Sequence, residues 1–386
     1  MFSNRLPTHA EINALSRAVE SVRRAGADII DLTQSNPTQA GIDYPADLLE
    51  ELGDERALRY EPHPLGLLSA RAAVADDFAR RGVVVDPASI VLSASTSEAY
   101  SWVFKLLCDP GASVLVPRPS YPLFEHLTRL ESVRAVPYEL RYHGRWEIDF
   151  DSVAAAPSDT KAVLLVSPNN PTGSYVWRAE ADALGAMCLQ RGWALVADEV
   201  FADYPLEATA AVTEVVLDSP VLSFTLSGAS KTVGLPQVKI AWMLIGGPAE
   251  ARDRALRGLE LIADTYLSVS TPVQVALPSL LSRGDAIRGS IRERLARNLA
   301  VARTLTTRYP ACDLLPVEGG WSAVIRVPAV RAEDALVIDL VRQEHVLAHP
   351  GYFFDFPHEA FVVVSLLPRE AVFADGLERL LRLASS

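Results

Sequence analysis

The stretch from Phe224 to Lys239, FTLSGASKTVGLPQVK, places one lysine, Lys231, among serines and glycines at the end of an apolar run. A lysine amine that loses its proton can act as a nucleophile or as a base, and an arginine can do neither. A lone lysine after small residues is most often a surface charge. Lys231 therefore becomes a candidate catalytic residue only through the residues that accompany it.

Polar loops follow several other apolar runs of the sequence in the same way. They read SASTSEA after 89–95, PRPSYP after 113–119, SPNNPTG after 162–168 and DEVFADY after 194–200. Taken alone, each loop has an ordinary interpretation as a helix cap, a turn or a surface pair. In an open parallel sheet, however, ligands bind beyond the carboxyl ends of the strands. With SGASK at 227–231, five loops are predicted to converge on one pocket.

The elements that must position these loops alternate along the chain. The apolar runs 89–95, 113–119, 162–168, 194–200, 221–227 and 240–246 are typical of strands buried on both faces. Helix-length segments at 98–111 and 178–192 lie between them, and each ends on a glycine. This order predicts an α/β fold with a mostly parallel central sheet and helices on both faces.

The pattern changes after about residue 249. Helical stretches at 249–267 and 286–308 lead to strand regions at 318–328 and 361–367 and to a closing helix from about Arg369. These elements predict a smaller α+β domain. We expect a large domain over 46–269 and a small domain built from 1–45 and 270–386.

Bulk composition excludes several classes of function. The net charge of -12 argues against a general nucleic-acid or anionic-membrane binder, because both need a basic face. Three widely spaced cysteines and scattered histidines indicate neither a disulfide framework nor a metal site. The sequence lacks an apolar stretch of signal-peptide or membrane-spanning length. We expect a soluble, cytoplasmic protein without a bound metal.

The motifs NNPTG, DEV and S-K, with a cationic residue eight positions after the lysine, resemble those of the class I aminotransferases. These are the fold-type I enzymes that use pyridoxal 5′-phosphate. The resemblance covers nearly the whole chain, from DLTQSNPT at 31–38 to EGGW at 318–321 and HPGYFF at 349–354. The longer stretches around these motifs resemble a bacterial branch of the family that is known only as generic aminotransferases.

The resemblance assigns the catalytic roles to two residues. Lys231 would hold pyridoxal phosphate as a Schiff base and would then move a proton at the substrate α-carbon. Asp198 would keep the pyridine nitrogen of the cofactor protonated.

The remaining cofactor contacts are implied in the same way. Asn170 would bind the ring's O3′, Tyr121 would stack on the ring, and Phe201 stands where the family has a tyrosine that also reaches O3′. The phosphate would lie at a helix N-terminus. Its ligands would be Ser95, Thr96, Ser97, Ser230, Lys239 and, from the partner subunit of a homodimer, Tyr60. Asn36 and Trp321 are the candidate substrate contacts.

The sequence departs from the family pattern at four positions. Lys239 replaces the usual arginine, Phe201 lacks the tyrosine hydroxyl, and Gly228 occupies a position where serine is common, which leaves Ser227 as a substitute. The fourth departure is the largest. Val363 stands where the family carries the arginine that binds the substrate α-carboxylate. Three arginines are candidates to replace it: Arg118, Arg326 and Arg369.

Three functions fit these observations. The leading one is an aminotransferase that moves an amino group between an amino acid and a 2-oxo acid. A β-lyase or decarboxylase acting on an unusual amino acid or amine is the alternative that Val363 favours. A non-catalytic pyridoxal phosphate sensor would need neither Lys231 nor Asp198.

Overall fold

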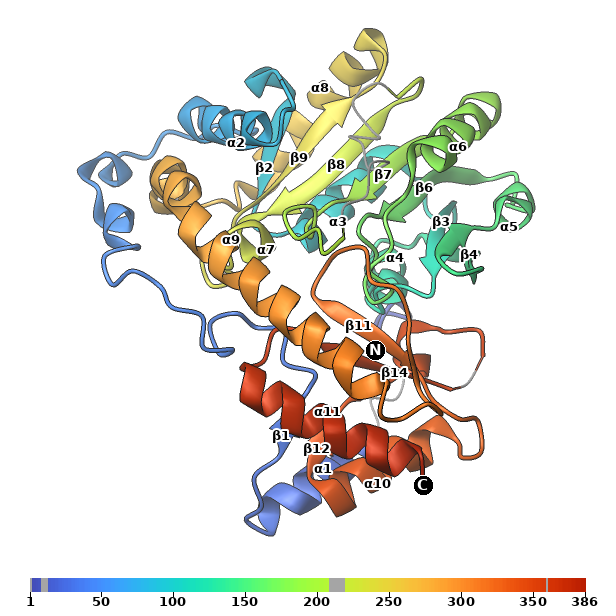
Figure 1. The fold of residues 1–386 in the computed structure, drawn as a ribbon. Coiled ribbons are helices and arrows are strands. Elements are labelled where there is room, and N and C mark those ends of the chain that lie inside the picture. Colours follow the sequence, from blue (N-terminus) through green and yellow to red (C-terminus); the bar gives the residue numbers. More distant parts are fainter. Residues whose placement is uncertain (1, 8–12, 208–218, 359) are drawn as a thin grey trace.

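The computed structural model describes residues 2–7, 13–207, 219–358 and 360–386. Two β-sheets and the helices around them make up most of this part of the chain. The larger sheet and its helices form the upper part of Figure 1, and the smaller sheet with the last helices forms the lower part. The long helix α9 (Thr271–Thr306) runs alongside both parts.

The large sheet has eight strands in the order β2-β9-β8-β7-β6-β3-β4-β5. The pairs from β8 through β7, β6 and β3 to β4 are parallel, while β9 and β5 run antiparallel to their neighbours. The mostly parallel sheet is thus confirmed. Its strands are β2 (Ile90–Ser93), β3 (Ser113–Arg118), β4 (Arg134–Tyr142), β5 (Trp146–Ile148), β6 (Thr160–Val166), β7 (Ala194–Asp198), β8 (Ser223–Gly228) and β9 (Ala241–Gly246).

Helices cover both faces of this sheet because its strands bury alternate side chains on opposite sides. Ala194 and Val196 of β7 pack with the helices of one face, which are α3 (Thr96–Leu107), α4 (Phe124–Leu130) and α8 (Ala249–Tyr266). Leu195 and Ala197 pack on the other face with α5 (Phe150–Ala154) and α6 (Arg178–Arg191). The helix α2 (Leu68–Arg80) packs against α9 and beside β2.

The small sheet is antiparallel, in the order β10-β11-β14-β13. Its strands are β10 (Asp313–Leu314), β11 (Ser322–Arg326), β13 (His349–Pro350) and β14 (Phe361–Ser365). The helices around it are α1 (Ala14–Arg24), α10 (Glu333–Glu344) and α11 (Glu370–Ala384), and the short strands β1 (Ile30–Asp31) and β12 (Val346–Leu347) pair in parallel. Leu15, Ala18 and Val22 of α1 pack against α10, so the N-terminal segment lies on this part of the chain. The proposed domain boundaries remain a prediction.

One predicted helix is longer in the structure, and two strands were not predicted. The helix expected at 286–308 is the second half of α9, which begins at Thr271 and contains Pro278. The strands β4 and β5 were not predicted, because β4 mixes exposed and buried residues and lacks the uniformly apolar run used to find the other strands.

Candidate active site

The five predicted loops leave one edge of the large sheet. Strands β3, β6, β7 and β8 are parallel, and β2 shares their direction because β9 runs antiparallel to both β2 and β8. Their carboxyl ends are Ser93, Arg118, Val166, Asp198 and Gly228. The loops beyond these residues therefore meet at the same edge, as the sequence predicted.

Asp198 is a buried carboxylate at the end of β7. Its side chain accepts hydrogen bonds from the hydroxyl of Tyr100, at 3.0 Å, and from the backbone N–H of Val200, at 3.1 Å. Burial raises the pKa of Asp198 to about 6, and these two hydrogen bonds and the charge of Lys231 oppose that rise. The two hydrogen bonds hold the carboxylate in place. Together with the charge of Lys231, they only partly offset the free energy that the charged form loses on leaving water.

Lys231 lies on α7 (Ala229–Thr232), the single turn that follows β8. Its Nζ is 4.7 Å from the centre of the Trp321 ring and 5.6 Å from that of Phe201. Burial lowers the pKa of Lys231 to about 8, and the charge of Asp198 opposes this shift. The amine can therefore lose its proton near neutral pH, which a surface lysine does not do.

Tyr204 fixes the backbone from which this lysine extends. Its hydroxyl donates to the carbonyl oxygen of Lys231 at 2.6 Å, and its ring packs edge-on against Trp321 at 5.2 Å. Tyr204 thus binds the lysine's own turn. The indole Nε1 of Trp321 is buried and has no hydrogen-bond partner within the described part of the chain.

The loop before α3 presents a helix N-terminus. Ser95 is the N-cap, and its hydroxyl accepts from the N–H of Glu98 at 3.1 Å. The Glu98 carboxylate accepts from the N–H of Ala94 at 2.6 Å. The N–H groups of Thr96 and Ser97 belong to the first turn, where no intrahelical acceptor exists. They are suited to an anion.

Ser230 and Lys239 follow β8 in the sequence. Ser230, beside Lys231, is partly buried, and Lys239 is exposed with a φ of 58°. That backbone conformation is unfavourable for a lysine, so the surrounding turn must impose it.

Tyr121 and Asn170 lie in loops that are bonded to each other. The hydroxyl of Ser120 donates to Asn169 at 2.8 Å, which joins the PSYP and NNPTG loops. Tyr121 packs edge-on against Phe124, and burial together with the charge of Asp198 raises its pKa. Asn170 Oδ1 accepts from the hydroxyl of Ser322 at 3.3 Å, which links the loop to the small sheet.

Asn36 and Tyr60 are among the predicted residues for which the structure shows no contact with Lys231. Asn36 closes its own turn, since its Oδ1 accepts from the N–H and the hydroxyl of Thr38 at 3.1 and 2.8 Å. Tyr60 is 76% exposed on the outer segment that precedes α2. Neither observation tests a role that depends on a substrate or a partner subunit.

The three arginines suggested as replacements at Val363 occupy different parts of the fold. Arg118 pairs with Glu139 on β4, and Arg326 pairs with Asp313 on β10. Arg369 is exposed at the start of α11, beside Gly41. Val363 itself is 2% exposed and lies in an apolar cluster.

Sequence reasoning missed Tyr100 and left Tyr204 unassigned. Tyr100 is one of many apolar residues of α3, and only the fold shows that it faces Asp198. The serine expected three residues before the lysine cannot fit at Gly228, because a Cβ there would lie 2.8 Å from that of Ala241. Ser227 is buried and its hydroxyl lies 3.2 Å from that of Thr232.

The described residues form neither a metal site nor a membrane-spanning helix. No group of three or more histidine, cysteine, aspartate or glutamate side chains there could hold a metal ion. None of the described helices is long and apolar enough to cross a membrane.

Comparison with known proteins identifies the family. The profile of the family "Aminotransferase class I and II" matches residues 27–372. The chain belongs to this family. It is therefore an aminotransferase, an enzyme that moves an amino group between an amino acid and a 2-oxo acid.

The curated relatives that match more than 90% of this chain are named as aminotransferases, and a shorter match is to a lyase. A glutamate-pyruvate aminotransferase of Haemophilus influenzae is 25% identical over 93% of this chain and 91% of its own length. An alanine aminotransferase structure from Pyrococcus furiosus superimposes with a TM-score of 0.87 at 21% identity and covers 99% of both chains. An S-alkyl-thiohydroximate lyase of Arabidopsis thaliana is 29% identical but covers 57% of this chain and 48% of its own length. The transferase match extends much further along the chain.

Proposed function

We propose that this aminotransferase holds pyridoxal 5′-phosphate at Lys231 and Asp198 and transfers amino groups there. The observation that carries the proposal is geometric: Lys231 lies on the turn after β8, at the edge where the neighbouring strand β7 ends in the buried carboxylate of Asp198. The pKa of the amine is lowered and that of the carboxylate is raised. Such opposed shifts are characteristic of functional sites. When bound, the cofactor would withdraw electrons from the substrate α-carbon.

The residues fit the cofactor's ring. Asp198 has neutral hydrogen-bond donors, Tyr100 and Val200, and a buried carboxylate of this kind gains most from a cationic N–H such as that of a protonated pyridine. Tyr121 offers an aromatic face near Asp198, and Asn170 would bind the ring's O3′. Phe201 leaves O3′ without a hydroxyl donor from that position.

The phosphate would bind at the start of α3. The free first-turn N–H groups of Thr96 and Ser97 and the hydroxyls of Ser95 and Ser230 supply neutral donors, and Lys239 supplies a positive charge. Lys239 contributes a point charge and not the bidentate fork of an arginine.

Lys231 would act as the base and acid of the reaction. Its pKa of about 8 leaves a substantial neutral fraction near neutral pH, so that Nζ can accept the proton of the α-carbon and return it. Trp321 and Phe201 keep water from the amine, and Tyr204 limits the movement of its backbone.

The relatives suggest which substrates to test first. The Haemophilus influenzae enzyme is named for glutamate and pyruvate. We therefore propose glutamate or alanine as amino donor and pyruvate or 2-oxoglutarate as acceptor. Trp321, whose ring lies beside the lysine, would contact the substrate.

The enzyme would work as a homodimer with shared sites. Tyr60 is exposed, and so are Leu58 at 88% and Leu68 at 63%, which are close to it in the sequence. Exposed apolar side chains in such number favour an interface between protein chains. A partner subunit seated there would present its Tyr60 to the phosphate.

Borohydride reduction followed by peptide mapping tests the cofactor site. We expect one peptide, the one containing Lys231, to gain the mass of the reduced cofactor, and Lys231→Ala to abolish this labelling. Labelling of Lys239 or of several lysines in the wild type would contradict the proposal.

A further inference from the structure

A polar residue lies directly beside Val363 on the neighbouring strand of the small sheet. In the small sheet Val363 pairs with Val324 on β11 and with His349 on β13. Directly opposed residues of antiparallel strands place their side chains on one face, with Cβ atoms about 4.5–5.5 Å apart. His349 therefore stands beside Val363 and faces the same way.

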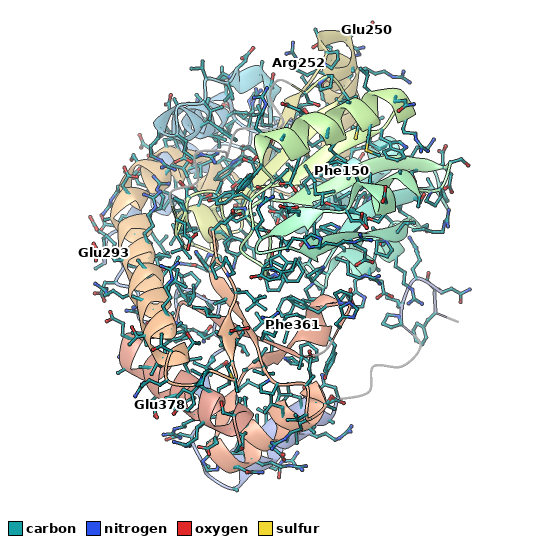
Figure 2. All side chains as sticks on the ribbon, turned by 45° about the vertical axis from the view of Figure 1, so that its right-hand side comes forward. Phe150, Glu250, Arg252, Glu293, Phe361 and Glu378 are labelled. Carbon is teal, nitrogen blue, oxygen red and sulfur yellow. The ribbon has the colours of Figure 1, made fainter. Side chains whose placement is uncertain are left out.

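That face of the small sheet is turned toward the loops of the active site. Ser322, two residues before Val324 on the same face, donates to Asn170. The carbonyl of Phe354 accepts from the N–H of Ser120, the neighbour of Tyr121, at 3.0 Å. Figure 2 shows Phe361, two residues before Val363, at the junction between the two sheets. His349 lies on the side of the sheet that meets the loops of Asn170 and Tyr121.

The imidazole of His349 is fixed by aromatic packing, but one of its ring nitrogens lacks a hydrogen-bond partner among the described residues. Its ring packs against those of Phe353 and Phe354, with centres 5.6 and 5.7 Å apart. Its Nδ1 is buried and has no hydrogen-bond partner among the described residues. A buried polar nitrogen without a partner is costly, and beside an active site it is available to a partner that arrives with the ligand.

Burial and one neighbouring carboxylate set the charge of His349 before a ligand binds. Burial lowers the pKa of His349, and the carboxylate of Asp31 opposes that shift. Asp31 already accepts from the N–H and the hydroxyl of Thr33, at 2.8 and 2.6 Å. An arriving carboxylate would oppose the effect of burial in the same way as Asp31 and favour the charged imidazolium.

We propose that His349 binds the α-carboxylate of the substrate, the task that Val363 cannot perform. The amide of Asn170, whose oxygen is occupied by Ser322, would supply a second donor. This inference rests on the proposed transamination of amino acids, since another chemistry would not require a carboxylate contact. Of the three arginines considered for this role, Arg118 and Arg326 are each paired with a carboxylate, and Arg369 is exposed at the start of α11.

A matched pair of ligands isolates this contact. Isopropylamine and 2-methylalanine have the same amine and methyl groups, and the carboxylate is present in 2-methylalanine alone. 2-Methylalanine has no α-hydrogen, so the proton transfer of transamination cannot follow its binding. The dissociation constant of each is measured on the cofactor-loaded enzyme from the change in the visible absorption of the cofactor.

We expect the wild type to prefer 2-methylalanine and His349→Leu to lose that preference by about ten- to a hundredfold. Binding of isopropylamine should not change. His349→Gln, which keeps a donor without a charge, should lie between the two. His143→Gln, at the exposed turn between β4 and β5, is the control and should behave as the wild type.

The outcomes separate this inference from the proposed function. If His349→Leu or His349→Gln keeps the full preference for the carboxylate while the wild type transaminates, the assignment of His349 is wrong and the proposed function stands. If the wild type binds both ligands equally, no group of the enzyme recognises the carboxylate, and the inference is again overturned. If neither ligand alters the cofactor spectrum and no amino acid does, both the inference and the proposed function fail.

Discussion

Gly228, three residues before Lys231, lies where two neighbouring strands leave no room for a side chain. It ends β8 and lies directly opposite Ala241 of β9. A Cβ at Gly228 would be 2.8 Å from the Cβ of Ala241, 3.0 Å from its Cα and 3.1 Å from the carbonyl oxygen of Ile240. Two of these atoms are backbone, so the strands themselves must separate. The φ of Gly228 is extended, and the penalty for a side chain is therefore steric alone.

Gly228→Ala should accordingly destabilise the enzyme. Overpacking typically costs about 1–3 kcal/mol, and the lower entropy of the unfolded alanine chain returns about 0.4–1 kcal/mol, so a net loss of about 1–2 kcal/mol is expected. Urea unfolding of the cofactor-free protein measures it. Gly289→Ala is the matched control, because no atom lies within 4 Å of a Cβ there and helix propensity should make that change neutral or stabilising.

A double mutant tests the cause of the loss. Ala241→Gly removes one of the three close contacts, so Gly228→Ala should cost less in that background, with a coupling energy of about 1 kcal/mol. Lys231 follows Gly228 by three residues, and cofactor affinity should fall together with stability. The reasoning is refuted if Gly228→Ala is as stable as the wild type, or if its cost is the same with and without Ala241.

Three further predictions follow from the site. Tyr204→Phe removes the hydrogen-bond donor to the Lys231 carbonyl, and the free energy of unfolding in urea should fall by about 1–2 kcal/mol. It should also lower kcat more than it raises KM. Unchanged stability and kcat would contradict this prediction. The pKa of Asp198 is raised to about 6 in the folded chain, so its contribution to the stability of the cofactor-free enzyme is full below about pH 4 and is lost as the pH rises through 6. Asp198→Asn should therefore reduce the loss of stability between pH 4 and pH 7.5 by up to about 3 kcal/mol, and an identical pH profile would count against the shift. Mixing inactive Lys231→Ala and Tyr60→Ala proteins should restore about a quarter of the sites if Tyr60 acts across a dimer, and no recovery would argue against a shared site.

Much of the fold follows from short-range patterns. Uniformly apolar runs located the strands that are buried on both faces, because such strands must be apolar along their whole length. The same rule missed β4, whose burial varies along the strand, and it could not reveal that α9 continues through Pro278.

The site was predictable where chain order carries the information. Lys231 and Asp198 end or follow buried strands, so the sheet brings them to one edge. Tyr100 and His349 could not be found in this way. Their roles depend on which face of a helix or sheet they occupy, and that is decided by long-range packing and register. The same limit applies to Gly228, whose necessity appears only when Ala241 is placed opposite it.

The central claim is that this enzyme transfers amino groups through Lys231 and Asp198. The most direct test is the visible absorption spectrum of the cofactor-loaded enzyme as single amino acids are added, followed by a 2-oxo acid. We predict that at least one amino acid, with glutamate and alanine tested first, abolishes the visible band and that pyruvate or 2-oxoglutarate restores it. A band that no amino acid changes, or a change accompanied by release of ammonia that no 2-oxo acid reverses, would contradict the account.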